Sequence, residues 1–209
     1  PMFEIVRSGG WLMFPLIVCS VVATAIILER LWSLQEKRVL PENLSAKVWE
    51  WVNKNELNDA HINTLRDSSV LGEILAAALV NRHRDLDSIK ERVQDTGRHV
   101  VHEMERFITT LGTIAAISPL LGLLGTVVGM VKVFAAITAH GVGNPTVLAG
   151  GISEALITTA AGLTVAIPAL IGYRYLRSRI DSLVVQMEKE AIKLVDRIRD
   201  DHEAGRYKT

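Results

Sequence analysis

Uncharged apolar runs of membrane-spanning length alternate with strongly charged segments along this chain. Residues 8–28, 107–131 and 155–173 contain no Asp, Glu, Lys or Arg. A hydrocarbon core of about 30 Å needs about 20 helical residues, so each run is long enough to cross a bilayer. The pattern therefore predicts an all-α integral membrane protein with three transmembrane helices.

Apolar residues continue at helical spacing beyond two of these runs. They recur at intervals near a heptad from residue 89 to residue 111, and again from residue 176 to residue 198. Such spacing is typical of amphipathic helices. We therefore expect the second and third transmembrane helices to extend into a cytoplasmic helical bundle, with shorter helices over residues 44–80.

The basic residues give an orientation. Of 23 Lys and Arg residues, 12 lie between Glu29 and Arg106 and nine lie from Arg174 onward. The positive-inside rule places both regions in the cytoplasm. The expected segments are a short periplasmic N-terminus (1–7), transmembrane helix 1 (8–28), a cytoplasmic helical loop (29–106), transmembrane helix 2 (107–133), a periplasmic turn (134–147), transmembrane helix 3 (148–173) and a cytoplasmic C-terminal helix (174–209). The first run lacks a small-residue cleavage site and is expected to remain as an anchor.

Composition argues against several function classes. The chain has 23 basic and 23 acidic residues, so its formal net charge is zero and no nucleic-acid surface is indicated. No phosphate loop, nucleophile elbow or paired catalytic carboxylates are present, so neither an enzyme nor a cofactor is expected. His99, His102 and Glu103 lie close on one predicted helix, but a solvated helix face explains them better than a metal site.

Glu154 is the only acid within the three predicted spans. An ionised side chain at the bilayer centre costs about 2.5–3.5 kcal/mol on insertion scales, so such residues tend to be functional. One reading places Glu154 near the outer interface, where it reaches water. The other makes it a proton-carrying or partner-sensing carboxyl that faces a pore, and we favour this second reading.

Threonines are candidates to accompany Glu154. If the outer turn is centred on His140, Thr126 lies as far before the turn as Glu154 lies after it, and the two should share a depth in the membrane. Helical periodicity places Thr158 on the face of Glu154, with Thr159 beside it. For each threonine, a hydrogen bond to a carbonyl of its own helix is an alternative that needs no function.

Small residues are dense in the second and third spans. Gly122, Gly125 and Gly129 form a stripe on one helix, and Gly162 belongs to a similar set on the other. Such residues let helix backbones approach closely. Packing within one chain is part of their role, and we also expect them to hold a homo-oligomer. Lys132 is expected to extend toward the outer interface.

Two longer motifs carry a family resemblance. The run AISPLLGLLGTVVGM (116–130) resembles the second-helix signature of the MotA/TolQ/ExbB proton-channel family, and GGISEALITTAAGL (150–163) with AIPA (166–169) resembles its third-helix signature. The three spans and the large first cytoplasmic loop extend the likeness over nearly the whole chain. The ExbB branch fits best, TolQ is close behind, and MotA is distant.

The resemblance implies a subunit that uses the proton motive force across a bacterial inner membrane. Family members form homopentamers around ExbD-like single-span helices that supply an aspartate, and the energy passes to TonB and to outer-membrane transporters for iron chelates and vitamins. Residues matching Thr126, Glu154 and Thr159 line the ion path, whereas periodicity alone favours Thr158. Lys132 departs from the neutral or weakly basic residue expected there, and the segment before the first span is very short.

Other functions remain open at this stage. A TolQ-like subunit of the Tol-Pal envelope system would share the motifs. A passive membrane scaffold would organise partners without using Glu154. An intramembrane enzyme is disfavoured because no pair of nucleophile and base is visible.

Overall fold

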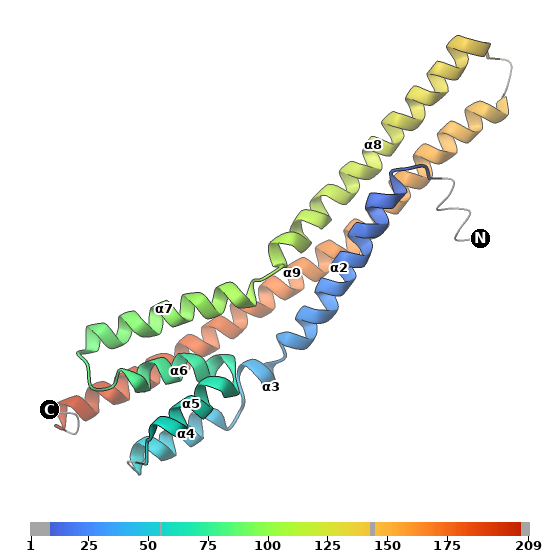
Figure 1. The fold of residues 1–209 in the computed structure, drawn as a ribbon. Coiled ribbons are helices and arrows are strands. Elements are labelled where there is room, and N and C mark those ends of the chain that lie inside the picture. Colours follow the sequence, from blue (N-terminus) through green and yellow to red (C-terminus); the bar gives the residue numbers. More distant parts are fainter. Residues whose placement is uncertain (1–8, 55, 143–144, 206–209) are drawn as a thin grey trace. The chain divides into compact units, whose positions relative to one another are not determined.

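The computed structural model describes residues 9–54, 56–142 and 145–205, and all regular structure within them is helical. The helices are α2 (Met13–Ser33), α3 (Glu36–Val39), α4 (Leu44–Asn53), α5 (Asp59–Ser68), α6 (Val70–Val80), α7 (Leu86–Met104), α8 (Ile108–His140) and α9 (Pro145–Glu203) (Figure 1). Three segments are long and apolar enough to cross a membrane, namely α2, the stretch that contains α8, and α9. The predicted all-α membrane fold is confirmed. The expected N-terminal segment 1–7 lies outside the described residues.

The chain divides into two compact units. One, here called the membrane unit, comprises Pro1–Glu29 and Phe107–Leu176. The other, here called the charged unit, comprises Arg30–Arg106 and Arg177–Thr209. The long helix α9 contributes its first part to the membrane unit and its second part to the charged unit.

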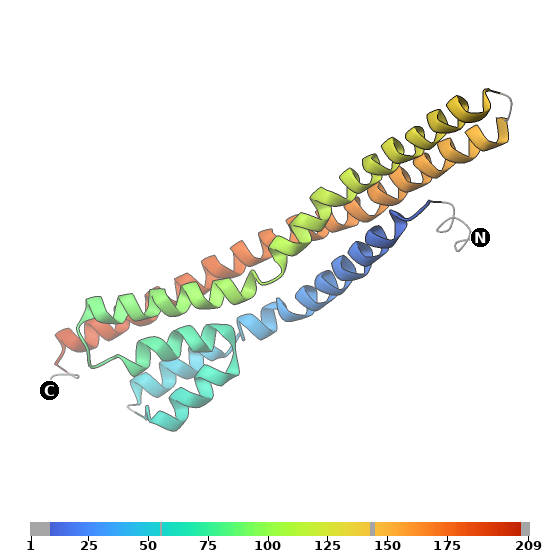
Figure 2. The ribbon, with the colours of Figure 1, turned by 45° about the horizontal axis from the view of Figure 1, so that its top comes forward.

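The membrane unit is built on an antiparallel pair, α8 and the first part of α9, which run side by side (Figure 2). The two helices approach at glycines, while α2 packs through small and apolar residues such as Ala23 and Ile26. Large apolar side chains cover the outside, for example Phe14, Leu120 and Ile171, all more than 60% exposed. So continuous an apolar exterior suits a bilayer rather than water, as expected for membrane-spanning helices.

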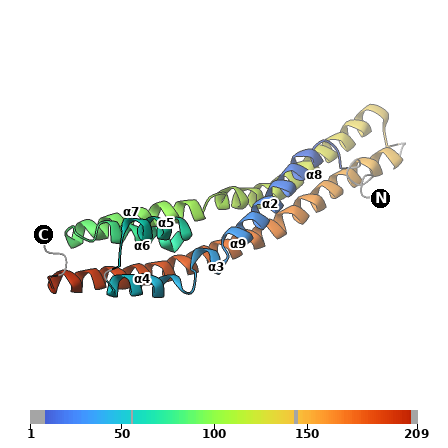
Figure 3. The same cartoon turned by 60° about the horizontal axis from the view of Figure 1, so that its bottom comes forward.

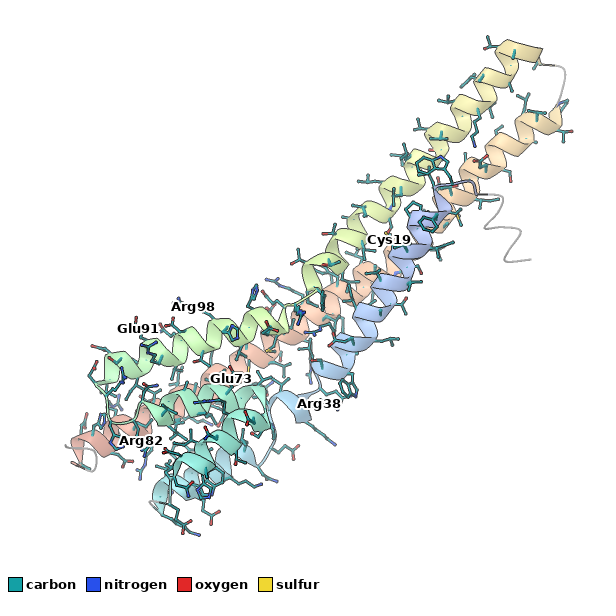
Figure 4. The ribbon with its side chains drawn as sticks, viewed as in Figure 1. Cys19, Arg38, Glu73, Arg82, Glu91 and Arg98 are labelled. Carbon is teal, nitrogen blue, oxygen red and sulfur yellow. The ribbon has the colours of Figure 1, made fainter. Side chains whose placement is uncertain are left out.

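The charged unit packs like a water-soluble bundle. Helices α5, α6 and α7 follow one another in contact, and Figure 3 shows α4 beside the C-terminal part of α9. Leucines of α6 form the centre, with Leu71, Leu75 and Leu79 almost fully buried. Charged side chains labelled in Figure 4 lie on α3, α6, α7 and the loop after α6.

Side-chain caps begin three helices of the charged unit. Asn58 accepts a hydrogen bond from the backbone N–H of His61 at 2.7 Å, Ser69 from that of Gly72 at 3.0 Å, and Asp85 from that of Ser88 at 3.0 Å. Each cap satisfies one N–H group that has no partner within its helix. The same residue types explain why this region breaks into short helices rather than continuing as one.

A break separates the amphipathic stretch from the second span. Residues 105–107 separate α7 from α8, and Phe107 has a left-handed backbone, with φ of 64°. That conformation is rare for a bulky residue. The amphipathic extension expected before the second span forms α7, which is a separate helix from α8.

Candidate functional site

Glu154 lies in the third turn of α9 and forms an ion pair across the helix pair. Nζ of Lys132, on α8, donates to Oε1 of Glu154 at 2.6 Å. The Glu154 side chain is 23% exposed and that of Lys132 is 51% exposed. The carboxylate is therefore partly exposed, and it is paired with a positive charge on the neighbouring helix.

The expectation for Lys132 was wrong. We expected its side chain to extend to the outer interface, whereas its ammonium turns to Glu154. A lysine and a glutamate that lie at the same depth of an apolar helix pair offset each other's desolvation, because neither needs to reach water to find a partner.

The turn before α2 closes another side of the carboxylate. Thr158 Oγ1 lies 2.7 Å from the carbonyl oxygen of Gly9, to which it donates. Gly10 has φ of +72°, and a Cβ atom there would collide with the Glu154 carboxylate. Glycine at position 10 thus suits the positive φ, and a side chain there would displace the Glu154 carboxylate from its present position.

The three candidate threonines have different partners. Thr158 is almost fully buried, and its hydroxyl also lies 2.9 Å from the carbonyl oxygen of Glu154. Thr159 Oγ1 donates across the helix pair to the carbonyl oxygen of Gly122 at 2.9 Å. Thr126 Oγ1 donates to Leu123 of its own helix at 2.6 Å. Thr158 therefore shares the face of Glu154, as periodicity indicates.

Thr126 does not share a depth with Glu154. Gly125 faces Thr158, and Gly129 faces Ala155, so Glu154 is level with α8 about one helical turn beyond Thr126. The prediction failed because α8 continues to His140 and ends at Gly141, which places the centre of the turn a few residues later than we assumed. With a centre near residue 142, Glu154 lies level with about residue 130, and the Lys132 side chain reaches its carboxylate from the next part of the same helix.

The glycine stripe is used within the chain. A Cβ atom at Gly162 would lie 2.6 Å from the carbonyl oxygen of Ser118, and one at Gly122 would lie 3.1 Å from Cα of Thr159. Gly125 and Gly129 also face α9. The packing role expected for these glycines agrees with this geometry, but the stripe no longer supports contact with a second chain.

Sequence reasoning missed two parts of the site, Lys132 and the Gly9–Gly10 turn. Lys132 is the only basic residue in the second predicted span, so the same argument that singled out Glu154 could have paired the two. The double glycine at the start of the first predicted span was also a visible signal of a tight approach. The assembled site combines a carboxylate, an ammonium group and a buried hydroxyl, a set that can hold or transmit a charge.

Comparison with known proteins gives the family. The profile of the MotA/TolQ/ExbB proton channel family matches residues 66–189, more than half of the chain. The biopolymer transport protein ExbB-like 1 of Synechocystis sp. is 38% identical over 179 residues, which are 82% of this chain and 68% of that relative.

Two further relatives represent both branches of interest. The biopolymer transport protein exbB1 of Vibrio cholerae is 30% identical over 200 residues, covering 88% of this chain and 83% of its own length. The Tol-Pal system protein TolQ of Haemophilus influenzae is 39% identical over 83 residues, covering 40% of this chain and 36% of its own length. The profile match and these relatives confirm the resemblance of the two helix motifs, and the chain belongs to the MotA/TolQ/ExbB proton channel family.

Proposed function

We propose that this chain is the ExbB-like subunit of an inner-membrane motor that is driven by protons and energises TonB-dependent outer-membrane transport. The observation that carries the proposal is Glu154, the only acid in the third predicted span, which is paired with Lys132 at 2.6 Å. Relatives named as ExbB proteins, which cover most of this chain, support the ExbB branch.

The proposed assembly is a homopentamer around an ExbD-like single-span partner, with a TonB-like protein receiving the energy. The N-terminus is periplasmic and the C-terminus cytoplasmic, because the basic residues gather in the segments 29–106 and 174–209. The partner supplies the acid that takes the proton. Glu154, with Thr126, Thr158 and Thr159, shapes the path or senses the partner.

The energetic requirement is modest. A membrane potential of 100 mV provides about 2.3 kcal/mol for each charge that crosses the membrane. Harvesting that energy requires a buried group whose charge or partner changes as the proton passes. Glu154 is the only acid in the three spans of this chain, so its carboxylate is the group whose removal should stop coupling.

The test uses a bacterial strain that depends on this protein and its co-expressed single-span neighbour for uptake of an iron chelate. Glu154→Ala and Glu154→Gln should abolish uptake while the complex still assembles, and Glu154→Asp should retain part of it. Glu91→Gln, the same chemical change on exposed α7, is the control and should leave uptake unchanged. Full uptake by Glu154→Gln at normal protein level would contradict the proposal and favour a passive scaffold.

A TolQ-like role in the Tol-Pal system is the second candidate, because a TolQ protein also matches this chain at 39% identity over 83 residues. Expression of the wild-type chain in a strain that lacks its own TolQ, beside the strain used for iron uptake, separates the two roles. Restoration of envelope integrity without restoration of iron uptake would assign the chain to the Tol-Pal system.

A further inference from the structure

We propose that Lys132 is the positioning residue for Glu154 and that the Gly9–Gly10 turn forms the back of a socket around the Glu154 carboxylate. The inference rests on the proposed function, because it assumes that the Glu154 carboxylate takes part in coupling. It adds a residue that sets where this carboxylate lies and a backbone turn that limits where it can move.

Charge is the first argument for the socket. Lys132 and Glu154 are the only Asp, Glu, Lys or Arg residues in 9–28, 107–142 and 145–173, and they are paired with each other at 2.6 Å. Removal of either partner would leave the other charge unpaired in an apolar setting, where attraction between charges is strong and solvation is poor. Lys132 is thus the group that fixes the direction of the carboxylate.

Steric closure is the second argument. The Gly10 backbone lies so close that no Cβ atom could be placed there without meeting the Glu154 carboxylate. The turn is held in that position by the buried hydrogen bond from Thr158 to the carbonyl oxygen of Gly9. Glu154 therefore has an ammonium group from α8 on one side and a glycine backbone on another.

Polar contacts link three segments of the membrane unit around Glu154. The ion pair joins α8 to α9 through Lys132, which lies beyond Thr126 on α8, and Thr158 joins the Gly9–Gly10 turn to α9 one turn from Glu154. Three segments of the membrane unit therefore meet at one carboxylate. A change at Lys132 or Gly10 should alter the position of Glu154 without removing it.

The role of the Lys132 charge is tested with the full complex, including its single-span partner, reconstituted in liposomes that contain a pH-sensitive dye. A potassium diffusion potential drives proton uptake. Lys132→Met should lower the flux about tenfold, the size expected for the loss of one charge-assisted hydrogen bond. Lys132→Arg should stay within about threefold of wild type because it keeps the charge. Wild-type flux with Lys132→Met would overturn the proposal.

An exchange of the two charges separates positioning from simple stabilisation. The double variant Lys132→Glu with Glu154→Lys keeps an ion pair but moves the carboxylate to α8. We expect normal assembly by native mass spectrometry and thermal stability restored relative to Lys132→Met, with flux still at least about tenfold below wild type. Restoration of both stability and flux would show that the location of the carboxylate does not matter and would overturn the positioning role.

Two glycines provide a matched test of the socket. Gly10 and Gly141 have φ of +72° and +70°, but only Gly10 faces Glu154, whereas a Cβ atom at Gly141 meets nothing within 4 Å. Gly10→Ala should lower flux several-fold and Gly141→Ala should not, although both replace a glycine that has a positive φ. Equal flux in the two variants would overturn the socket.

Glu154→Gln in the same liposomes separates a failure of the positioning inference from a failure of the proposed function. If Glu154→Gln is inactive while Lys132→Met and Gly10→Ala conduct like wild type, the positioning inference fails and the proposed function stands. If Glu154→Gln itself conducts like wild type, the proposed function fails, and the positioning inference fails with it.

Discussion

The membrane unit and the charged unit use opposite kinds of side chains for packing. In the membrane unit, glycines and threonines lie between α8 and α9 while large apolar residues such as Leu120 and Ile171 are exposed. In the charged unit, Leu75 and Leu79 are buried while charged residues face outward. The difference shows how the solvent decides which contacts hold a helical protein together.

Apolar burial drives folding only where the alternative is water. Hydrocarbon chains solvate leucine as well as a neighbouring helix does, so helices in a bilayer associate through close backbone packing and hydrogen bonds. The hydrogen bond from Thr159 to the Gly122 carbonyl is an example from the membrane unit. The charged unit instead gains from its leucine core and from capped helix ends.

The largest effect should follow from loss of a core leucine in the charged unit. Leu79 is fully buried, whereas Ile192 is 60% exposed. Leu79→Ala should lower the opening free energy of α6 by about 2–5 kcal/mol, because it removes buried surface and leaves a cavity. Hydrogen exchange of the α6 amides in the detergent-solubilised chain measures this. Ile192→Ala should change it by no more than about 0.5 kcal/mol, and an equal loss in both variants would contradict the buried core.

A smaller effect is expected when the glycine packing of the membrane unit is disturbed. A Cβ atom at Gly162 would lie 2.6 Å from the Ser118 carbonyl oxygen, while one at Gly150 would meet nothing within 4 Å. Gly162→Ala should destabilise the chain by about 1–3 kcal/mol through overpacking. Gly150→Ala should be neutral or slightly stabilising, because alanine favours helix.

Thermal stability in mild detergent, followed by fluorescence-detected size exclusion, distinguishes the two glycine variants. If Gly162→Ala were as stable as Gly150→Ala, close backbone contact would not be what holds α8 to α9. The contrast with the leucine variant would then lose its basis, since both units would depend on the same kind of burial.

The sequence predicted the helices better than it predicted their registration. Apolar runs fix which segments enter a bilayer, and amphipathic spacing predicts the helices beyond them. The break at Phe107 follows no Gly or Pro, so no local signal marks it. The misplaced turn centre gave Thr126 as the predicted partner of Glu154, whereas the structure pairs Glu154 with Lys132. A shift of two or three residues in one helix of a hairpin changes every facing pair.

The sequence predicted the central residue of the candidate site but only some of the residues around it. Glu154 stands out because an acid in an apolar run is costly. Thr158 follows from a period of 3.6 residues. The Gly9–Gly10 turn meets α9 only in three dimensions, since almost 150 residues separate Gly9 from Thr158, and no periodicity within one helix can report such a contact.

The smallest effect concerns a single charge at a helix end of the charged unit. Asp85 caps α7 by accepting hydrogen bonds from the backbone N–H of Ser88 at 3.0 Å and from its hydroxyl at 2.8 Å. The Ser88 backbone bond, followed by the hydroxyl bond, lowers the pKa of the Asp85 carboxyl from its ordinary value. A carboxyl whose pKa is lower in the folded state stabilises that state above its unfolded pKa of about 3.9. The contribution disappears as the pH falls through the lowered folded value.

Asp85→Asn keeps a capping oxygen but removes the titration, so it serves as the matched control for Asp85→Ala. Protection of the first-turn amides of α7, corrected for intrinsic exchange rates, should fall for the wild type as the pH drops below about 4. It should stay nearly constant for Asp85→Asn over the same interval, and Asp85→Ala should be less protected than wild type at neutral pH, where the cap is intact. Because the site is exposed to water, we expect these changes to be smaller than those at Leu79 or Gly162. A pH response in Asp85→Asn equal to that of the wild type would show that another group titrates. The Asp85 cap would then stabilise α7 through its hydrogen bonds and not through its charge. In the membrane unit, by contrast, the charge of Glu154 is expected to decide function.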